Sequence, residues 1–132
     1  MKIRASYVLF FGTLFAGLAV AAGAFGAHTL KQVLDPDKLA VFETAARYQM
    51  YHALGLCLVS LVMDRYPNLG LETVGWFFTA GIVLFSGSLY GLALTGVRWL
   101  GVSTPVGGLA MVAGWGLFAW KMLPIMAGRT SQ

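Results

Sequence analysis

Polar side chains of several chemical types crowd one short stretch of this sequence, residues 42–52, at the start of a long apolar run. Glu43 and Arg47 lie four residues apart with the acid first, the order that favours an ion pair along a helix. A second set with the same spacing forms a ridge beside them: Thr44, Tyr48 and His52. A carboxylate, a guanidinium, a phenol and an imidazole together could carry protons or bind an ion, so this stretch is the first candidate site.

The depth of the stretch in a membrane makes its polar groups costly. One helix from Lys38 to Met63 would be about 39 Å long, against a hydrocarbon layer of about 30 Å. Counting about 20 residues back from Met63 puts the membrane boundary near Thr44. Arg47 then lies one turn inside and His52 not far from the midplane. Polar groups at that depth have to face protein or water.

We therefore expect the polar arc of this helix to face the interior of a bundle, with Glu43 holding Arg47 there. The opposite arc would face lipid or another subunit, and it carries Phe42, Ala45, Ala46, Met50 and Ala53. His28 ends the preceding apolar run on the same membrane side and could join the network. The predicted polar cluster comprises His28, Glu43, Thr44, Arg47, Tyr48, Gln49 and His52.

Each of these groups has a structural and a functional interpretation. The Glu43–Arg47 pair is either a packing device or a proton or ion site, and His52 is either a hydrogen-bonded core residue or a proton relay. Two histidines could in principle ligate a haem, but nothing else in the sequence supports one. A zinc site needs three or four ligands, which two histidines and Cys57 do not supply. We expect no metal site, no cofactor and no catalytic set.

Composition defines the class of protein. The chain has 132 residues, of which 58% are hydrophobic and only 11% charged, whereas about a quarter of a soluble domain is charged. Nine basic residues outnumber five acidic ones, but they are scattered and form no cluster that would grip nucleic-acid phosphates. The single cysteine excludes an intrachain disulfide. The partner that composition predicts is the lipid bilayer, with no nucleic acid, and no small-molecule or ion ligand is identified.

Four apolar segments predict an all-α membrane protein, a bundle of four transmembrane helices forming one domain over residues 1–132. The first segment also resembles a secretory signal peptide, but it is long enough to span. Asp35 and Pro36 are typical of a helix start, Gly96 of a helix end, and Thr104 of a cap before the fourth helix, which we expect to fade at Lys121 and Pro124. The expected spans are residues 5–27, 44–63, 73–95 and 105–123.

Small and polar residues recur on single faces of the first and third segments, where they let another helix approach closely. Glycine and alanine are also simply common in membrane helices, which is the alternative explanation. We expect Ser86 and Ser88 to donate hydrogen bonds between helices. Because the small-residue stripes exceed what one bundle needs, we expect a homo-oligomer. The predicted helix-packing residues are Gly12, Ala16, Gly23, Gly26, Ser86, Gly87, Tyr90 and Gly91.

Four motifs, in order along nearly the whole chain, carry a family resemblance. They are GAFGAH at residues 23–28, TAARYQMYHA at 44–53, LFSGSLY at 84–90 followed by LTG at 94–96, and PVGG at 105–108. With these motifs the chain closely resembles the YgdD/YwdK-type small membrane proteins, a domain of unknown function. The resemblance implies a four-helix protein of the bacterial inner membrane. It implies no activity, substrate or catalytic residue.

Two classes of function remain open at this stage. The first is a non-enzymatic oligomeric membrane protein with a transport, channel or assembly role that uses the polar cluster. The second is a membrane enzyme or cofactor protein that acts on a lipid-soluble substrate such as a quinone, through His28, Tyr48 and His52. The lack of a nucleophile–base pair and of a metal-ligand set favours the first class.

The charge pattern predicts the orientation of the chain. Five basic residues fall on the side of the two termini (Lys2, Arg4, Arg65, Lys121 and Arg129) and three on the other (Lys31, Lys38 and Arg98), or four if Arg47 is counted. The positive-inside rule then places both termini in the cytoplasm. A reporter enzyme that works only outside the cytoplasm, fused after Gln132, should be inactive. Activity of that reporter would contradict the orientation.

Overall fold

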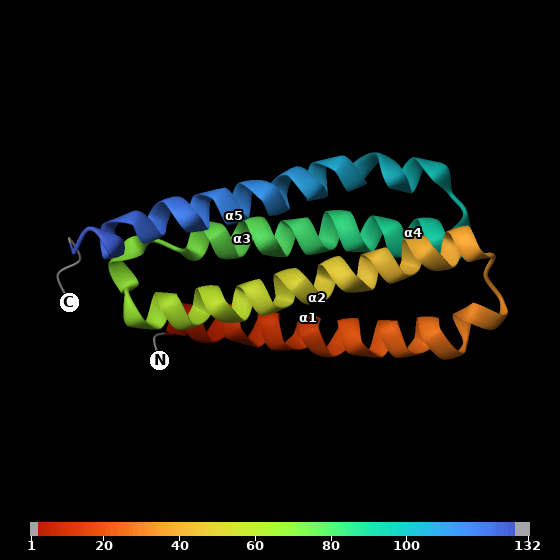
Figure 1. Cartoon of the computed structure of the whole chain (residues 1–132), viewed down its shortest axis with the longest axis horizontal. Helices are drawn as coiled ribbons and strands as arrows, with labels where there is room; N and C mark the ends of the chain where they lie inside the picture. Colours follow the sequence, from red (N-terminus) through yellow and green to blue (C-terminus); the bar gives the residue numbers. More distant parts are fainter. Residues whose placement is uncertain (1–2, 129–132) are drawn as a thin grey trace.

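The computed structural model describes residues 3–128, and these form helices and short turns. Three uninterrupted rods are α1 (Ile3–His28), α2 (Pro36–Arg65) and α5 (Thr104–Met126). The remaining rod joins α3 (Glu72–Gly81), the π-helical segment η3 (Ile82–Ser86) and α4 (Gly87–Thr95). Turns of 3₁₀ helix connect the rods: η1 (Leu30–Gln32), η2 (Pro67–Leu69) and η4 (Arg98–Ser103). The rods lie side by side, and α1 begins at the same end of the molecule at which α5 ends (Figure 1).

Helix α1 packs on α2 along a seam of small residues. The buried residues of α1 recur at every seventh position: Ala5, Gly12, Ala19 and Gly26. A seven-residue repeat keeps one face of a helix against a neighbour that crosses at a small angle. A Cβ atom at Gly12 would lie 2.8 Å from Cys57 Sγ and 3.0 Å from the carbonyl oxygen of Ala53. The two backbones are therefore as close as glycine allows.

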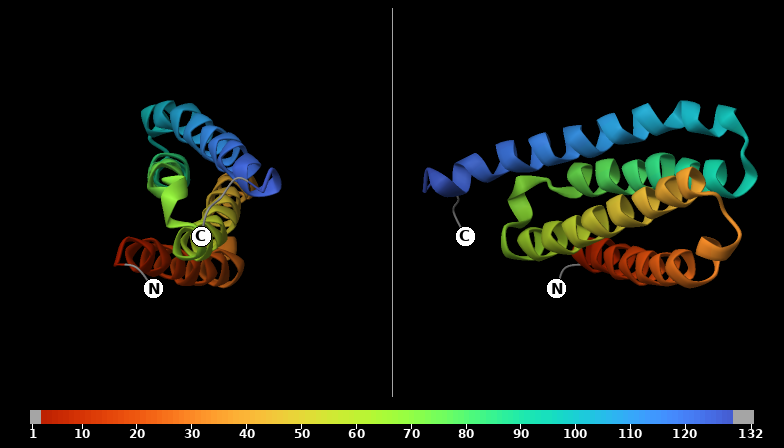
Figure 2. Two further views of the ribbon diagram at one scale, coloured as in Figure 1. Left: turned by 90° about the vertical axis from the view of Figure 1, so that its left-hand side faces the viewer. Right: turned by 45° about the vertical axis from the view of Figure 1, so that its right-hand side comes forward.

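Helix α2 is the central element of the bundle. It packs against α1, α3 and α4, whereas α1 and α5 lie on opposite sides of the molecule in the end-on view (Figure 2). Its buried positions also follow a seven-residue pattern: Phe42, Gln49, Leu56 and Met63 in one series, and Ala45, Ala46, His52, Ala53, Val59 and Ser60 between them. Along the α1–α2 contact, Gly26 lies against Phe42 and Gly12 lies against Ala53 and Cys57.

Local signals at helix ends were partly confirmed. Asp35 caps α2 by accepting a hydrogen bond of 2.9 Å from the Lys38 N–H, and this bond holds the pKa of the carboxyl below its usual value. Gly96 ends α4 with a φ of 71°. Thr104 is not a cap; it is the first residue of α5, and its hydroxyl oxygen lies 2.7 Å from that of Ser88. Helix α5 continues through Pro124 to Met126, because a proline in the last turn removes only one backbone hydrogen bond.

The predicted all-helical membrane architecture is confirmed in part. Three segments of residues 3–128 are long and apolar enough to cross a membrane, Ile3–Gln32, Glu72–Thr95 and Arg98–Met126. Helix α2 is not among them, because Arg47, Gln49 and His52 lie in its middle part. Four rods are present, and the fourth span stays a prediction. Lys2 and Arg129, which enter the charge count, lie outside the described residues.

The close contact between α5 and the π-helical segment can be tested by its effect on the stability of the bundle. A Cβ atom at Gly107 would overlap backbone atoms of Leu84 and Phe85, which cannot rotate away. We expect Gly107→Ala to destabilise the bundle by about 1–3 kcal/mol, the usual cost of overpacking, measured as loss of helical circular dichroism on heating in detergent. Gly116→Ala on the same helix is the matched control, since nothing lies within 4 Å of its Cβ position. Equal melting temperatures for the two variants would contradict the close contact.

Candidate functional site

The polar residues of α2 divide between an inner and an outer face. Gln49 and His52 are buried, with exposed fractions of 5% and 4%. Glu43, Arg47 and Tyr48 are exposed on the outside of the subunit. Successive residues of a helix are about 100° apart, so neighbours in sequence fall on different faces. The predicted cluster is thus divided into buried residues and exposed residues.

Gln49 joins three helices from the inner face. Its Nε2 donates a hydrogen bond of 2.9 Å to the backbone carbonyl of Phe15 on α1, and its Oε1 accepts one of 2.9 Å from the hydroxyl of Tyr90 on α4. Tyr90 also packs its ring 4.8 Å from that of Phe42. The amide donates to α1 and accepts from α4 at once, so we interpret Gln49 as a structural tie in the middle of the bundle.

His52 has partners for both ring nitrogens. Its Nδ1 lies 2.7 Å from the carbonyl oxygen of Tyr48, and its Nε2 lies 3.1 Å from Nε1 of Trp115 on α5. A carbonyl oxygen can only accept and an indole N–H can only donate. These partners assign a neutral imidazole protonated on Nδ1, with the ring also 5.4 Å from that of Phe78. The core interpretation of His52 is the one that the contacts support.

The expectation that Glu43 holds Arg47 inside the bundle is wrong. Both side chains are exposed, and no ion pair joins them in residues 3–128. The predicted orientation of α2 is also wrong, because the arc assigned to lipid is largely buried. Phe42, Ala45, Ala46 and Ala53 on this arc are at 6% exposure or less. Alanines let the α1 backbone approach closely, whereas charged side chains on that arc would keep it away.

The outer polar residues border a hollow at the surface between α1 and α2. It encloses about 320 Å³ and is lined by Ala19 and Gly23 of α1 and by Glu43, Ala46 and Arg47 of α2. Ala19 lies eight residues inside the end of the uncharged run of residues 5–27, or about 12 Å at 1.5 Å per residue. The charges of Glu43 and Arg47 therefore stand beside a part of α1 that has the composition of a membrane interior. We call Glu43 and Arg47 the charged face.

The other members of the predicted cluster bond within their own helices. His28 Nδ1 lies 2.9 Å from the carbonyl oxygen of Ala24, and Thr44 donates a bond of 2.8 Å to the carbonyl oxygen of Ala40. Neither is brought to His52 by a hydrogen bond in the described part of the chain. Residues 3–128 include no group of three or more His, Cys, Asp or Glu side chains that could hold a metal ion.

The predicted packing residues have mixed outcomes. Gly12, Gly26 and Gly91 each lie against a neighbouring element, and Tyr90 bonds Gln49. Ala16 is partly buried on α1. Gly23 and Gly87 have nothing within 4 Å of a Cβ position. Ser88 makes the expected contact between helices, but the buried hydroxyl of Ser86 has no hydrogen-bond partner within residues 3–128.

Sequence reasoning missed the contribution of Trp115. This residue lies in the middle of the apolar α5, where its indole N–H has to find an acceptor. A tryptophan far from either end of a membrane segment was the available signal, because tryptophan is otherwise enriched at the interfaces. Its partner is one of the two histidines of the chain, His52.

The inner tie generates a double-mutant test. Tyr90→Phe leaves Gln49 Oε1 without its donor, and Gln49→Leu leaves the Tyr90 hydroxyl without its acceptor. We expect each change to lower the unfolding free energy in detergent by about 1 kcal/mol. The double variant should lose less than the sum of the two, by about 0.5 kcal/mol or more. Tyr51→Phe, at an exposed position of α2, is the control, and strict additivity would contradict the bond.

Comparisons with known proteins identify the family of the chain. A family model described as "Protein of unknown function (DUF423)" matches residues 22–108. The chain is 48% identical to the UPF0382 membrane protein YwdK of Bacillus subtilis over 105 residues, covering 79% of this chain and 85% of the relative. It is 47% identical to a UPF0382 membrane protein of Staphylococcus saprophyticus over 104 residues, covering 79% and 86%.

A more distant relative carries the name of a cellular compartment. The chain is 37% identical to the UPF0382 inner membrane protein YgdD of Escherichia coli over 111 residues, covering 84% of this chain and 85% of the relative. No solved structure matches. The relatives' names and the three helices that are long and apolar enough to span confirm the expected location in the bacterial inner membrane. The chain belongs to the UPF0382 family of membrane proteins, whose domain is the DUF423 domain of unknown function.

Proposed function

We propose that this protein is a non-enzymatic, four-span membrane protein that works as a homo-oligomer and conducts ions or small polar solutes between its subunits. The charged face of α2 lines the proposed path. The observation that carries this proposal is the exposure of Glu43 and Arg47 beside the uncharged run of α1. Such groups are costly in lipid and mark ion pathways when they face water.

The length of the uncharged part of α2 supports this proposal. Between Arg47 and Asp64 there are 16 uncharged residues, which span about 24 Å as a helix. The hydrocarbon layer is about 30 Å thick. If α2 crosses together with α1, against which it packs, a charge at one end or the other lies within that layer. Arginine costs about 2.5–3.5 kcal/mol at the centre of a membrane helix on insertion scales and less near its ends, and water or a second subunit at the charged face would lower that cost.

A second copy of the chain has the chemistry to cover this face. Glu43 and Arg47 are opposite charges one helical turn apart, so the face is complementary to itself. In a two-fold interface the same patch occurs on both sides, and Glu43 of one copy can meet Arg47 of the other. Gly23 and Ala19 beside them lack bulky side chains and leave room for close approach. In the proposed oligomer, the acid of one subunit therefore faces the base of the other across the water-filled path.

The enzymatic alternative depended on His28, Tyr48 and His52 sharing one space. In the described chain His52 is buried with both ring nitrogens engaged, Tyr48 is on the outside, and His28 bonds its own helix. Tyr48 stacks on His52 with ring centroids 6.4 Å apart, but no contact brings His28 to them in residues 3–128, so the three side chains do not form one site. This arrangement favours the non-enzymatic class.

Charge reversal tests the subunit interface. Glu43→Arg makes both copies of the face positive and Arg47→Glu makes both negative, so each single variant should shift the mass measured in mild detergent from oligomer to monomer. The double variant exchanges the two charges and should restore the oligomer. Lys31→Glu, in the α1–α2 connection, should leave the mass unchanged. A wild-type protein that is monomeric at all concentrations would contradict the proposal.

Flux through reconstituted vesicles tests conduction separately. Vesicles loaded with potassium should release it faster with the wild-type protein than without it. Gly23→Leu fills the hollow beside the charged face and should reduce this release, whereas Gly116→Leu on α5 should not. An intact oligomer whose vesicles leak no faster than empty ones would contradict conduction and leave only an assembly role.

A further inference from the structure

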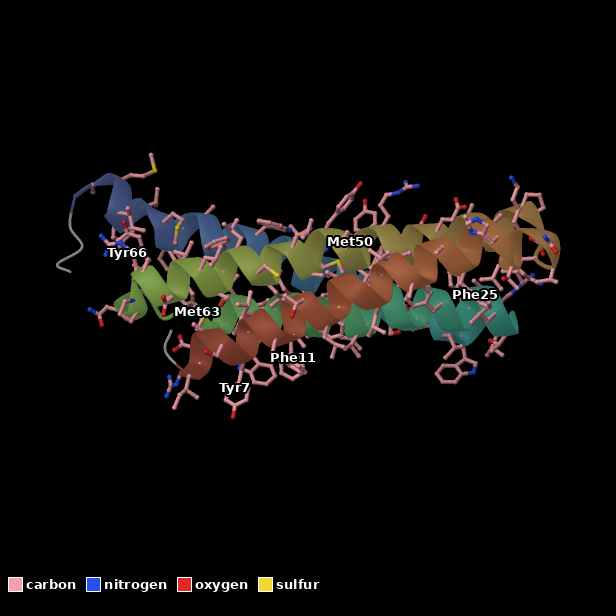
Figure 3. The ribbon with its side chains drawn as sticks, turned by 90° about the horizontal axis from the view of Figure 1, so that it is seen from below. Tyr7, Phe11, Phe25, Met50, Met63 and Tyr66 are labelled. Atoms are coloured by element: carbon pink, nitrogen blue, oxygen red, sulfur yellow. The ribbon has the colours of Figure 1, made fainter. Side chains whose placement is uncertain are left out.

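A second hollow, remote from the charged face, opens between α1 and α3 at the end where α1 begins. It encloses about 450 Å³, within the range of small-molecule sites. Its walls are largely apolar and aromatic, with Tyr7 and Phe11 from α1, Trp76 from α3, and Leu56 of α2. Tyr7 and Phe11 point away from α2 on the outer side of α1 (Figure 3).

The hollow exists because α1 and α3 both pack on α2 and diverge from each other there. Gly75 of α3 lines it without a side chain, and a Cβ atom at this position would first meet Val8 at 3.5 Å. That is an ordinary van der Waals distance, so the site has room for one more hydrocarbon group. A larger side chain at position 75 would enter the hollow.

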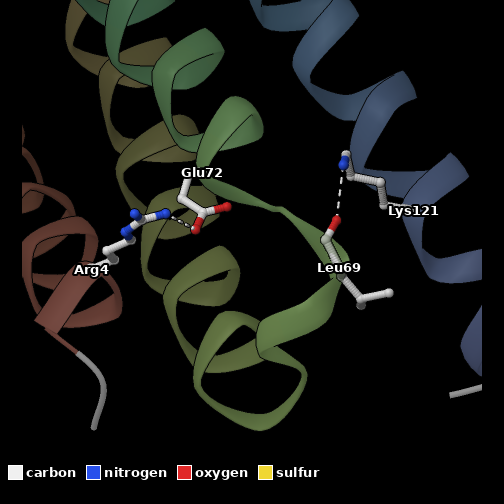
Figure 4. Close-up of polar contacts among 4 residues, drawn as sticks. All are labelled: Arg4, Leu69, Glu72 and Lys121. Atoms are coloured by element: carbon white, nitrogen blue, oxygen red, sulfur yellow. Dashed lines mark hydrogen bonds and ion pairs between the residues drawn. The ribbon is translucent and has the colours of Figure 1, made fainter. Parts of the chain in front are cut away.

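An ion pair stands at the mouth of the hollow. Arg4 Nη1 donates a hydrogen bond of 3.1 Å to Oε1 of Glu72, linking the start of α1 to the start of α3 (Figure 4). The Arg4 side chain is 80% exposed and that of Glu72 34%, so the guanidinium is open to the surroundings, whereas the carboxylate is partly covered and also lies in the field of Lys121. A further hollow of about 420 Å³ shares Arg4 and Glu72 and extends toward the η2 turn. The Arg4–Glu72 ion pair therefore lies between an apolar hollow and a more polar one.

The height of the ion pair is that of lipid headgroups. Arg4 directly precedes the uncharged run of residues 5–27, and Glu72 directly precedes the uncharged run of residues 73–97. Tyr7 and Trp76, which flank the hollow, are residue types enriched at this level of a membrane. Polar groups at the mouth and hydrocarbon below it reproduce the layering of a phospholipid.

We propose that this hollow binds one phospholipid molecule with a phosphoethanolamine headgroup, an acyl chain lying against Gly75 and Leu56. The lipid phosphate accepts hydrogen bonds from Arg4, and the lipid ammonium donates to the Glu72 carboxylate. A choline headgroup has no N–H to donate to that carboxylate. A glycerol headgroup brings no positive charge to it. The paired charges of Arg4 and Glu72 therefore complement the zwitterion best.

The test is competition among lipids for the purified full-length protein. Delipidated protein in detergent is mixed with equal amounts of phosphatidylethanolamine, phosphatidylcholine and phosphatidylglycerol, and retained lipid is identified by native mass spectrometry. We expect a preference for phosphatidylethanolamine of about tenfold. Gly75→Leu should abolish retention, and Gly116→Leu, a glycine with nothing within 4 Å of its Cβ position, should not change it.

A second variant separates headgroup selection from folding. Glu72→Gln removes the negative charge but not the apolar hollow, so it should still retain a lipid while losing the preference for ethanolamine over choline. Helical circular dichroism verifies that each variant is folded. Equal retention of the three lipids by the wild-type protein, or an unchanged preference in Glu72→Gln, would overturn the proposal whatever Gly75→Leu does.

Discussion

The close contact between α1 and α2 is the constraint on which the rest of the structure depends. In lipid there is no hydrophobic force that drives helices together, so they associate through packing and hydrogen bonds. Both occur along this seam. Ser60 donates a hydrogen bond of 2.7 Å to the carbonyl oxygen of Ala5, and Gln49 donates one of 2.9 Å to that of Phe15. The side chains of Ser60 and Gln49 reach the α1 backbone because the seam residues of α1 are alanine and glycine.

This seam also decides which side chains of α2 face outward. A bulky residue at position 53 would separate the backbones near the level where Gly12 meets Cys57, and this position holds alanine. Charged residues then have to occupy the remaining arc. Glu43 and Arg47 are exposed because of the packing requirement of the opposite face. The position of the charged face is a consequence of the small-residue seam.

Sequence reasoning succeeded where a signal is local and failed where two elements had to be matched. The cap at Asp35 and the left-handed Gly96 depend on a few neighbouring residues, and both could be predicted. The orientation of α2 depended on the assumption that polar groups face the interior of their own bundle. The better signal was the seven-residue series of small residues in α1, Ala5, Gly12, Ala19 and Gly26, because such a series needs a neighbouring helix face without charged side chains. The bonds from Tyr90 to Gln49 and from Trp115 to His52 link distant positions that no spacing rule connects.

Arg47 and Gln49 lie close together in α2 but have different surroundings. They are two positions apart, so their side chains point about 200° away from each other around the helix axis. Gln49 makes hydrogen bonds to two other helices and is explained by the folded subunit alone. Arg47 carries a charge beside the uncharged run of α1 and makes no ion pair within residues 3–128. Its cost in the membrane is offset by no ion pair in the described subunit, so its surroundings outside the subunit decide how that cost is met.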